Sequence, residues 1–299
     1  MLVDINERVL SEGKNVDAAL KLAEWARSAD YDSVVKAYAE CHRDPNIDDS
    51  FIRTLAQCDR FYLGVFICNR HDMLHEWIYE RCREVESGKD NHLDLWARFH
   101  YKSTIITFLG CVQEVLCNPD ITIGILSYSA RQAKPFLRQV MQEFESNEKL
   151  QNLFPDILWK NPKHQAPKWA ENEGICVNRF ANPKEQTVEA HGLVDGQPTG
   201  RHFSLIIYDD VVVQDAITTP EQIKKTTTQW ELSLNLGSTH TNTRELGTHT
   251  GTHTEQFYKE PQLNLEYIPQ LTMVRWMVTQ FFLLKNVGKK LKKPHLPTP

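Results

Sequence analysis

Apolar residues recur along the chain in two spacings, which together predict alternating helices and strands. Spacings of three and four residues, typical of one face of an α-helix, occur in four stretches: 1–55, 73–85, 103–117 and 130–144. Shorter runs rich in leucine, isoleucine and aromatic residues predict strands over 92–97, 121–128 and 203–208. The last two runs are apolar almost throughout, as in parallel strands covered on both faces. This order of elements predicts an α/β fold.

The C-terminal part of the chain follows neither spacing. Residues 236–254 repeat short Gly-Ser/Thr-His-Thr units with few aliphatic side chains, and such a composition predicts a segment that contributes little to a core. The final stretch, LLKNVGKKLKKPHLPTP, is basic and ends in prolines, which predicts a frayed end. We therefore expect an irregular C-terminal tail.

The bulk composition is that of a water-soluble globular protein. With 299 residues, 41% hydrophobic and 24% charged, the chain is long enough for one large domain or two smaller ones. It has no apolar run of the roughly 18 residues needed to span a bilayer, and its N-terminus lacks a signal-peptide pattern. We therefore expect no membrane partner and a cytoplasmic protein.

Charge and cysteine usage narrow the function classes further. The formal net charge of -5 argues against a protein that coats nucleic acid non-specifically, but it allows a motor that holds DNA through a few basic loops. The seven cysteines are odd in number and form no CxxC pair, so free buried thiols are expected and a zinc site is not.

A candidate phosphate-binding loop lies at Ala97–Thr104, between a predicted strand and a predicted helix. Such a loop needs a lysine for the β- and γ-phosphates and a hydroxyl for Mg²⁺, and Lys102 and Ser103 have the required spacing. The standard motif has glycines where this chain has Trp96 and Tyr101. Taken alone, the segment therefore also fits a chance match.

A second candidate feature follows the strand predicted at 203–208. Asp209 and Asp210 come directly after this apolar run, where nucleotide-hydrolysing P-loop proteins carry the acid that holds Mg²⁺. A solvated acidic turn is the simpler interpretation of these two residues alone. About a hundred residues separate them from Lys102, which leaves room for intervening strands in one sheet. The two features together predict a Mg²⁺-nucleotide site.

Three strings resemble the ATPase domain of phage terminase large subunits: LDLWARFHYKSTIITF, ITIGILSYSARQAKPFLRQVMQEFE and HGLVDGQPTGRHFSLIIYDDVV. That family has a Walker A loop without the standard glycines and a Gly-x-Arg approach to the Walker B strand, here Gly200-Arg201. The resemblance covers roughly residues 60–235. It implies a P-loop NTPase of the ASCE/RecA-like type, with a mostly parallel sheet flanked by helices. The implied organisation is a helical N-terminal region at 1–55, an ATPase domain at 56–262 and a divergent basic tail at 263–299.

The resemblance also implies roles for single residues. Lys102 would neutralise the β- and γ-phosphates, and Arg98 would sense or stabilise the γ-phosphate, although a surface arginine is an equal alternative. Ser103 and Asp209 would hold Mg²⁺, and Asp210 stands where many relatives have the catalytic glutamate. The residues expected to contact ATP are Arg98, Phe99, His100, Tyr101, Lys102, Ser103, Thr104 and Trp77.

Other positions have two open interpretations. Trp77 or Tyr79 would stack on adenine if they are not simply core residues. Arg131 would reach DNA or a neighbouring nucleotide if it is not a solvated residue at a helix start. The family's coupling motif, a strand that ends in a small hydroxyl residue, matches Leu246-Gly247-Thr248, with Leu236-Gly237-Ser238 as a competitor. The histidines of the repeat, His240, His249 and His253, have poor spacing for a metal site.

The function implied is ATP hydrolysis that drives DNA into a procapsid, at the portal in the host cytoplasm. The implied partners are duplex DNA, the small terminase subunit, the portal protein and identical subunits in a ring. The basic tail lacks the carboxylates of the family's nuclease domain, so nuclease activity is not expected. Two alternatives remain: an inactive prophage remnant, truncated or frame-shifted at its end, and another SF2-like P-loop ATPase.

Overall fold

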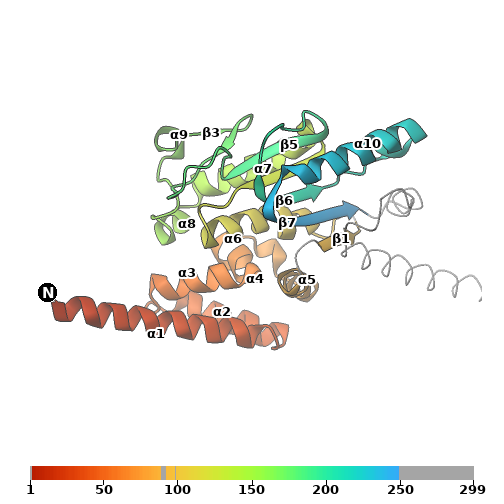
Figure 1. Cartoon of the computed structure of the whole chain (residues 1–299). Helices are drawn as coiled ribbons and strands as arrows, with labels where there is room; N and C mark the ends of the chain where they lie inside the picture. Colours follow the sequence, from red (N-terminus) through yellow and green to blue (C-terminus); the bar gives the residue numbers. More distant parts are fainter. Residues whose placement is uncertain (1, 89–91, 98, 249–299) are drawn as a thin grey trace, which may run out of the picture.

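The computed structural model describes residues 2–88, 92–97 and 99–248 (Figure 1). In this part of the chain the helices are α1 (Leu2–Ala26), α2 (Tyr31–Arg43), α3 (Asp49–Cys58), α4 (Arg60–Tyr62), α5 (Glu76–Ser87), α6 (Leu109–Cys117), α7 (Ala130–Ser146), α8 (Glu148–Leu153), α9 (Pro162–Gln165) and α10 (Pro220–Ser233). Two π-helical turns, η1 (Leu63–Ile67) and η3 (Ser103–Phe108), and three 3-10 turns, η2 (His71–Met73), η4 (Gln214–Ile217) and η5 (Leu234–Leu236), complete the set.

One mixed sheet organises the fold. Its strands are β1 (His92–Trp96), β2 (Ile123–Ser129), β3 (Trp169–Ala170), β4 (Gly174–Ile175), β5 (Val188–Asp195), β6 (Phe203–Asp209) and β7 (Gly237–Thr248). Among the described residues their order is β1-β7-β6-β2-β5-β4-β3, with parallel pairing from β1 to β5 and antiparallel pairing of β4 and β3. Because β1, β6 and β2 are parallel, their carboxyl ends meet at one edge of the sheet.

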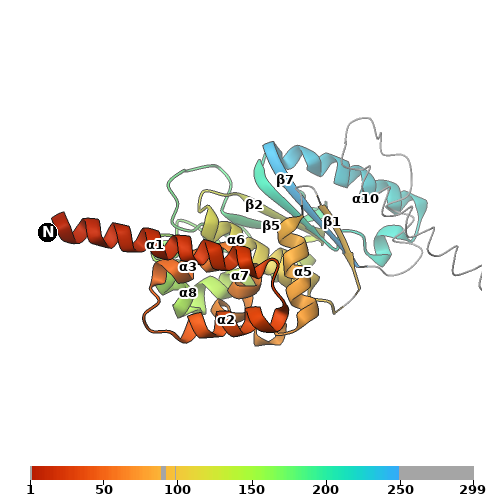
Figure 2. The same ribbon diagram turned by 90° about the horizontal axis from the view of Figure 1, so that it is seen from below.

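Helices cover both faces of this sheet, as the sequence predicts for an α/β fold. The larger core joins residues of α1–α8 with residues on one face of the sheet, such as Ile125 and Ile207, and α1 packs on α3. The smaller core, which includes Phe203 and Tyr208, packs Trp230 of α10 against the other face. Figures 1 and 2 show α1, α2, α3 and α5 gathered on the side of the sheet away from α10. The domain boundary expected at residue 55 falls inside α3.

The predicted helices and strands of the chain's first two thirds are confirmed. The helical regions contain α1–α3, α5, η3 with α6, and α7, and the three apolar runs are β1, β2 and β6. None of the helices in the described ranges combines the length and the apolar character that a membrane span requires. All seven cysteines lie in these ranges and are unpaired thiols, of which four are buried: Cys68, Cys82, Cys111 and Cys176.

The expectation of an irregular segment is wrong for residues 237–248, although these residues contribute few side chains to the core. They form β7, which lies between β1 and β6 and pairs with both in parallel. A strand with two neighbours is held by its backbone hydrogen bonds, and β-branched threonine is well suited to a strand. Leu246 is buried in the larger core. The expected tail at 263–299 lies outside the described residues.

Two further elements escape the sequence pattern because polar residues interrupt it. In β5, buried Glu189 is satisfied by His191 Nε2 at 2.9 Å, Arg201 Nε at 3.3 Å and the Gln186 backbone N–H at 2.8 Å. In α10, the residues that face inwards are mostly polar, and Thr219 caps the N-terminus by accepting from the Gln222 backbone N–H. Their polar groups can be buried because each has a hydrogen-bond or ion-pair partner, and the pattern of apolar residues does not reveal these partners.

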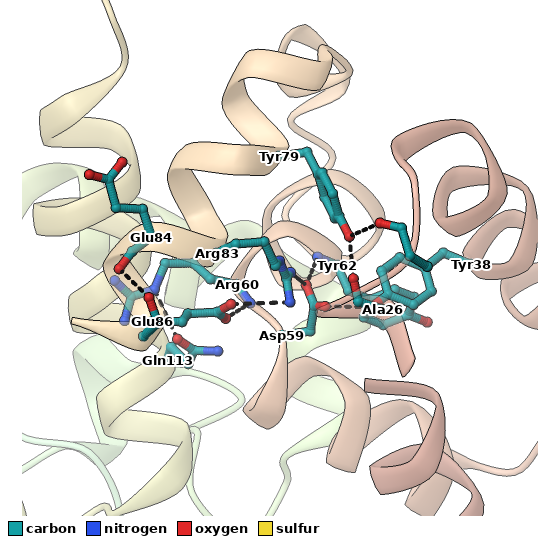
Figure 3. A network of polar contacts seen from close by, with 12 residues as sticks. Ala26, Tyr38, Asp59, Arg60, Tyr62, Tyr79, Arg83, Glu84, Glu86 and Gln113 are labelled. Atoms are coloured by element: carbon teal, nitrogen blue, oxygen red, sulfur yellow. Dashed lines mark hydrogen bonds and ion pairs between the residues drawn. The ribbon is translucent and has the colours of Figure 1, made fainter. Parts of the chain in front are cut away.

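A buried charge network joins the N-terminal helices (Figure 3). Asp59, between α3 and α4, accepts hydrogen bonds from the Tyr38 hydroxyl and, at 2.8 Å, from the Tyr62 backbone N–H. Arg83 of α5 pairs with Asp59 at 2.5 Å and with Glu86 at 3.2 Å. Because a buried charge is tolerated only with partners, this network specifies how α2, α4 and α5 pack.

The Glu86 carboxylate makes the stability of the fold depend on pH. Its side chain is 12% exposed, and burial, together with the nearby Asp59 charge, raises its pKa to about 7, against the attraction of Arg83 and Arg60. The native state therefore holds a proton that the unfolded state releases near its ordinary pKa of 4.5. The contribution of Glu86 to the free energy of unfolding is complete below that pKa and is lost as the pH rises to about 7.

We expect the Glu86→Gln variant to remove this loss. Between about pH 5 and about pH 7 the free energy of unfolding of the wild type should fall relative to the variant, by at most about 1.4 kcal/mol per pH unit. Urea unfolding followed by tryptophan fluorescence measures this difference. Glu80→Gln, on the exposed side of α5, is the matched control and should run parallel to the wild type. Parallel profiles for Glu86→Gln and the wild type would contradict the prediction.

Candidate functional site

The parallel sheet brings the two motifs predicted from the sequence together at the carboxyl ends of β1 and β6. Lys102, at the end of the loop after β1, lies with its Nζ 2.7 Å from Asp210 Oδ1 and 3.5 Å from Asp209 Oδ1. Lys102 is buried although it carries an ammonium group. The two carboxylates at the end of β6 are the ion-pair partners that make its burial possible.

Asp209 is the centre of the cluster. Its side chain is 0% exposed, and it accepts hydrogen bonds from Ser103 Oγ at 3.1 Å and from Thr107 Oγ1 at 2.6 Å. Burial raises the pKa of the Asp209 carboxyl, while Lys102 and the two hydroxyl groups oppose that rise and the Asp210 charge adds to it. A lysine, a serine and a threonine from one loop and helix thus surround one strand-end carboxylate.

Asp210 differs from Asp209 in exposure and backbone. Its side chain is 44% exposed, and its φ of 50° lies in the left-handed region. Its backbone N–H donates to the Leu246 carbonyl at the end of β7, 3.1 Å away. The strand β7 therefore lies between the strand that precedes the Lys102 loop and the strand that ends at Asp209. Asp210 is on the solvent-exposed side of the cluster.

The loop before Lys102 has the backbone of a glycine-containing turn without the glycines. Phe99 has a φ of 65° and Tyr101 a φ of 60°, in the region that glycine adopts without steric cost. Tyr101 stands where the standard motif has its second glycine. Its hydroxyl is hydrogen-bonded to Asp72, which Arg70 holds through contacts of 2.9 and 2.7 Å. This contact anchors the loop to the segment before α5 and helps to hold the strained backbone.

Aromatic side chains line the base of the loop. Trp77 of α5 packs edge to face on Trp96, at 5.8 Å between ring centroids, and on His100, at 5.1 Å. The Arg81 guanidinium lies 5.5 Å from the same Trp77 ring. Trp77 thus lies beside the loop, in contact with the loop's own rings. Tyr79 points away from it, buried with its hydroxyl donating to the Ala26 and Ala29 carbonyls, so its core interpretation is correct.

The remaining candidates are spread over the fold. Arg98 lies outside the described residues. Thr104 is half-buried in η3, next to Ser103, and Arg131 is exposed at the start of α7. Arg201 lies at the opposite end of the sheet, before β6, where its Nη1 donates to the Lys184 carbonyl at 2.9 Å. The Gly200-Arg201 motif therefore ties the entry of β6 to the segment before β5 and does not reach the cluster.

The two candidate coupling motifs occupy opposite ends of β7. Leu246-Gly247-Thr248 ends the strand beside Asp210, whereas Gly237 and Ser238 begin it beside Phe203 at the far end of the sheet. Only the first candidate borders the cluster. Of the repeat histidines, His240 lies in β7, and His249 and His253 lie outside the described residues. In the described part of the chain no group of three or more His, Cys, Asp and Glu side chains is placed to hold a metal ion.

Two polar residues of the site were missed in the sequence. Thr107 lies four residues after Ser103, and this helical spacing was a signal that both hydroxyls share one face. Ser127 follows Leu126, which pairs with Tyr208, so it stands beside Asp209 on the neighbouring strand and on the same face. Ser127 is 1% exposed, and its Oγ has no hydrogen-bond partner among the described residues.

We expect Thr107→Val to destabilise the fold by about 1–3 kcal/mol, because it leaves a buried carboxylate one donor short. Urea unfolding at neutral pH measures the change. Thr227→Val is the matched control, since the Thr227 hydroxyl donates to the Ile223 carbonyl of its own helix at 2.9 Å. The control should change stability by less than about 0.5 kcal/mol. Equal effects of the two substitutions would show that Asp209 does not depend on Thr107.

The strain at Phe99 can be measured because its side chain is 96% exposed and adds little packing. Alanine keeps the left-handed strain at this position, and glycine removes it. We expect Phe99→Gly to be more stable than Phe99→Ala by about 1 kcal/mol, as measured by thermal or urea unfolding. If Phe99→Gly is the less stable of the two, the loop does not hold Phe99 in the left-handed region in solution.

A scan against protein-family models finds no match for this chain, and a search of curated proteins finds none either. What is known of the cluster around Asp209 is therefore its geometry, together with the resemblance of three sequence strings to the terminase ATPase domain.

Proposed function

We propose that this chain is the ATP-hydrolysing motor module of a phage or prophage terminase large subunit, which drives DNA into a procapsid. One observation carries the proposal. Lys102 and Ser103, after a parallel strand, contact Asp209 and Asp210, after a second strand of the same sheet. A phosphate-binding lysine, a hydroxyl and strand-end acids in such proximity are the parts that P-loop NTPases use.

The residues present fit a Mg²⁺-nucleotide. Mg²⁺ prefers oxygen ligands and is usually held by one or two carboxylates together with substrate phosphates, so a cluster of three protein carboxylates is not required. Ser103 Oγ and the Asp209 carboxylate, 3.1 Å apart, offer these oxygens. They would hold the ion, which when bound supplies positive charge to the phosphates. Thr107, which donates to the other carboxylate oxygen of Asp209, would orient that carboxylate.

The chain's own side chains supply the remaining chemistry. Lys102 would exchange its contact with Asp210 for the β- and γ-phosphates. Because Asp210 is partly exposed and adjoins the phosphate-binding lysine, it would orient an attacking water and accept its proton. The aspartate is one methylene shorter than the glutamate of many relatives, so Asp210 would have the shorter reach.

The strand order supports the ASCE type of P-loop fold. β7 follows β6 in the chain but lies between β1 and β6 in the sheet, which is the insertion expected of that type. The wider role rests on the resemblance alone. It includes duplex DNA, a small terminase subunit, a portal protein, a ring of identical subunits and work at the portal in the host cytoplasm. Arg131, exposed at the start of α7, is a candidate DNA contact.

We expect Mg²⁺-dependent ATP hydrolysis that Lys102→Ala lowers at least about 100-fold, because the charge on the phosphates loses its fixed partner. Asp210→Asn should lower kcat about 100-fold or more while the affinity for Mg²⁺-ATP stays within about threefold. Asp210→Glu should retain activity. Steady-state hydrolysis and nucleotide binding measure these effects, with and without duplex DNA. Lys134→Ala, at a partly exposed lysine of α7 that donates to Asn172 Oδ1, is the matched control.

The outcomes separate the alternatives. Activity that duplex DNA stimulates and that is lost in Lys102→Ala supports the motor. Activity without any response to DNA favours another P-loop ATPase. If the wild type neither binds nor hydrolyses Mg²⁺-ATP, the motor proposal fails and the chain is an inactive remnant that keeps the fold.

A further inference from the structure

The helix that follows Lys102 starts in an unusual conformation. Residues Ser103–Phe108 form a π-helical turn, in which the Leu109 backbone N–H donates to the Thr104 carbonyl. Single π turns are rare and occur frequently at functional sites. This turn contains both Ser103 and Thr107, which donate to different oxygens of Asp209. Whatever holds the turn therefore also holds the two hydroxyl groups on Asp209.

The guanidinium of Arg60 packs against this turn from the side of the N-terminal helices. Its Nη1 donates to the Ile105 carbonyl at 3.4 Å, and its Nε donates to Gln113 Oε1 of α6 at 2.9 Å. Gly110 lies next to the same group, since a Cβ at that position would stand 3.7 Å from Nη1. Arg60 thus contacts both the π turn and the α-helix that continues it.

Arg60 is itself held by residues of the buried charge network. Its backbone N–H donates to Glu86 Oε1 at 2.5 Å, and the preceding residue, Asp59, pairs with Arg83 (Figure 3). Gln113 is fixed by donating to the Gln57 carbonyl at 3.1 Å. The junction of α3 and α4 therefore connects α5 to the helix that carries Ser103 and Thr107.

Stability alone does not account for an arginine at this place. A guanidinium buried away from water costs several kcal/mol of desolvation, and an apolar side chain of similar size often gives equal or higher stability. What an apolar side chain lacks is the planar fork of donors that spans the Ile105 carbonyl and Gln113. The contribution specific to Arg60 is therefore the geometry of the turn.

We propose that Arg60 is a positioning residue for the candidate nucleotide site, which holds the π turn so that Ser103 and Thr107 face Asp209. This role makes the N-terminal helices part of the machinery that presents Ser103 to Mg²⁺. Its consequence for nucleotide binding rests on the proposed function, whereas its consequence for the turn does not.

The test compares Arg60→Met with Arg60→Lys, which keeps the charge but lacks the fork. Amide hydrogen exchange over residues 103–109 should become about tenfold faster in both variants, with exchange over β2 unchanged. The affinity for Mg²⁺-ATP should fall about tenfold, and kcat at saturating substrate should change less. Arg53→Met is the matched control, because Arg53 of α3 pairs with Asp156 at the surface and lies outside the network. It should alter neither exchange over 103–109 nor affinity.

Each outcome of the exchange measurement either supports or overturns the positioning role of Arg60. Unchanged exchange over 103–109 overturns the positioning role, and so does an equal acceleration across the whole chain, which would indicate a merely structural residue. If Arg60→Met does not fold, Arg60→Lys decides by the same exchange measurement. If the wild type binds no Mg²⁺-ATP, the proposed function fails, while the exchange measurement still decides whether Arg60 holds the turn.

Discussion

The centre of this structure is arranged around the buried carboxylate of Asp209, which needs hydrogen-bond donors and a positive charge close to it. A carboxylate at the end of a central strand, away from water, is tolerated only where donors and a positive charge surround it. Lys102, Ser103 and Thr107 meet that requirement, and all three belong to the segment that follows β1. The need to compensate one charge thereby brings together the two chain segments of the candidate site.

The segment that provides these donors is under constraint from both ends. On the loop side, Phe99 and Tyr101 adopt left-handed backbone, and Tyr101 is anchored on Asp72. On the helix side, a π turn replaces the regular α-helical start and contacts the guanidinium of Arg60. Standard glycines would make the loop conformation free of steric cost. Without them, contacts with the N-terminal helices hold the loop, so these helices and the site are one physical unit.

In the strand β7, it is the backbone polar groups that depend on partners from other parts of the chain. Its repeat of glycine, threonine and histidine has few apolar side chains. The strand is nevertheless held, because β1 on one side and β6 on the other form hydrogen bonds with its backbone N–H and C=O groups. A strand in the middle of a parallel sheet needs neighbours more than it needs a hydrophobic sequence. Its carboxyl end borders Asp210, so the strand also connects the two halves of the site.

The sequence by itself determined the elements whose apolar side chains form short continuous runs or recur at helical spacing. These include β1, β2, β6 and α7, and with them the placement of Lys102 in the loop after one strand and of Asp209 at the end of another, because the apolar pattern that predicts burial is local in the sequence. Only the tertiary structure decided β5 and β7, the contacts of Thr107 and Arg60, and the core position of Tyr79. In each of these cases the deciding contact is a hydrogen bond or an ion pair to a residue that is remote in sequence. Such partners follow from register and packing, which no local pattern contains.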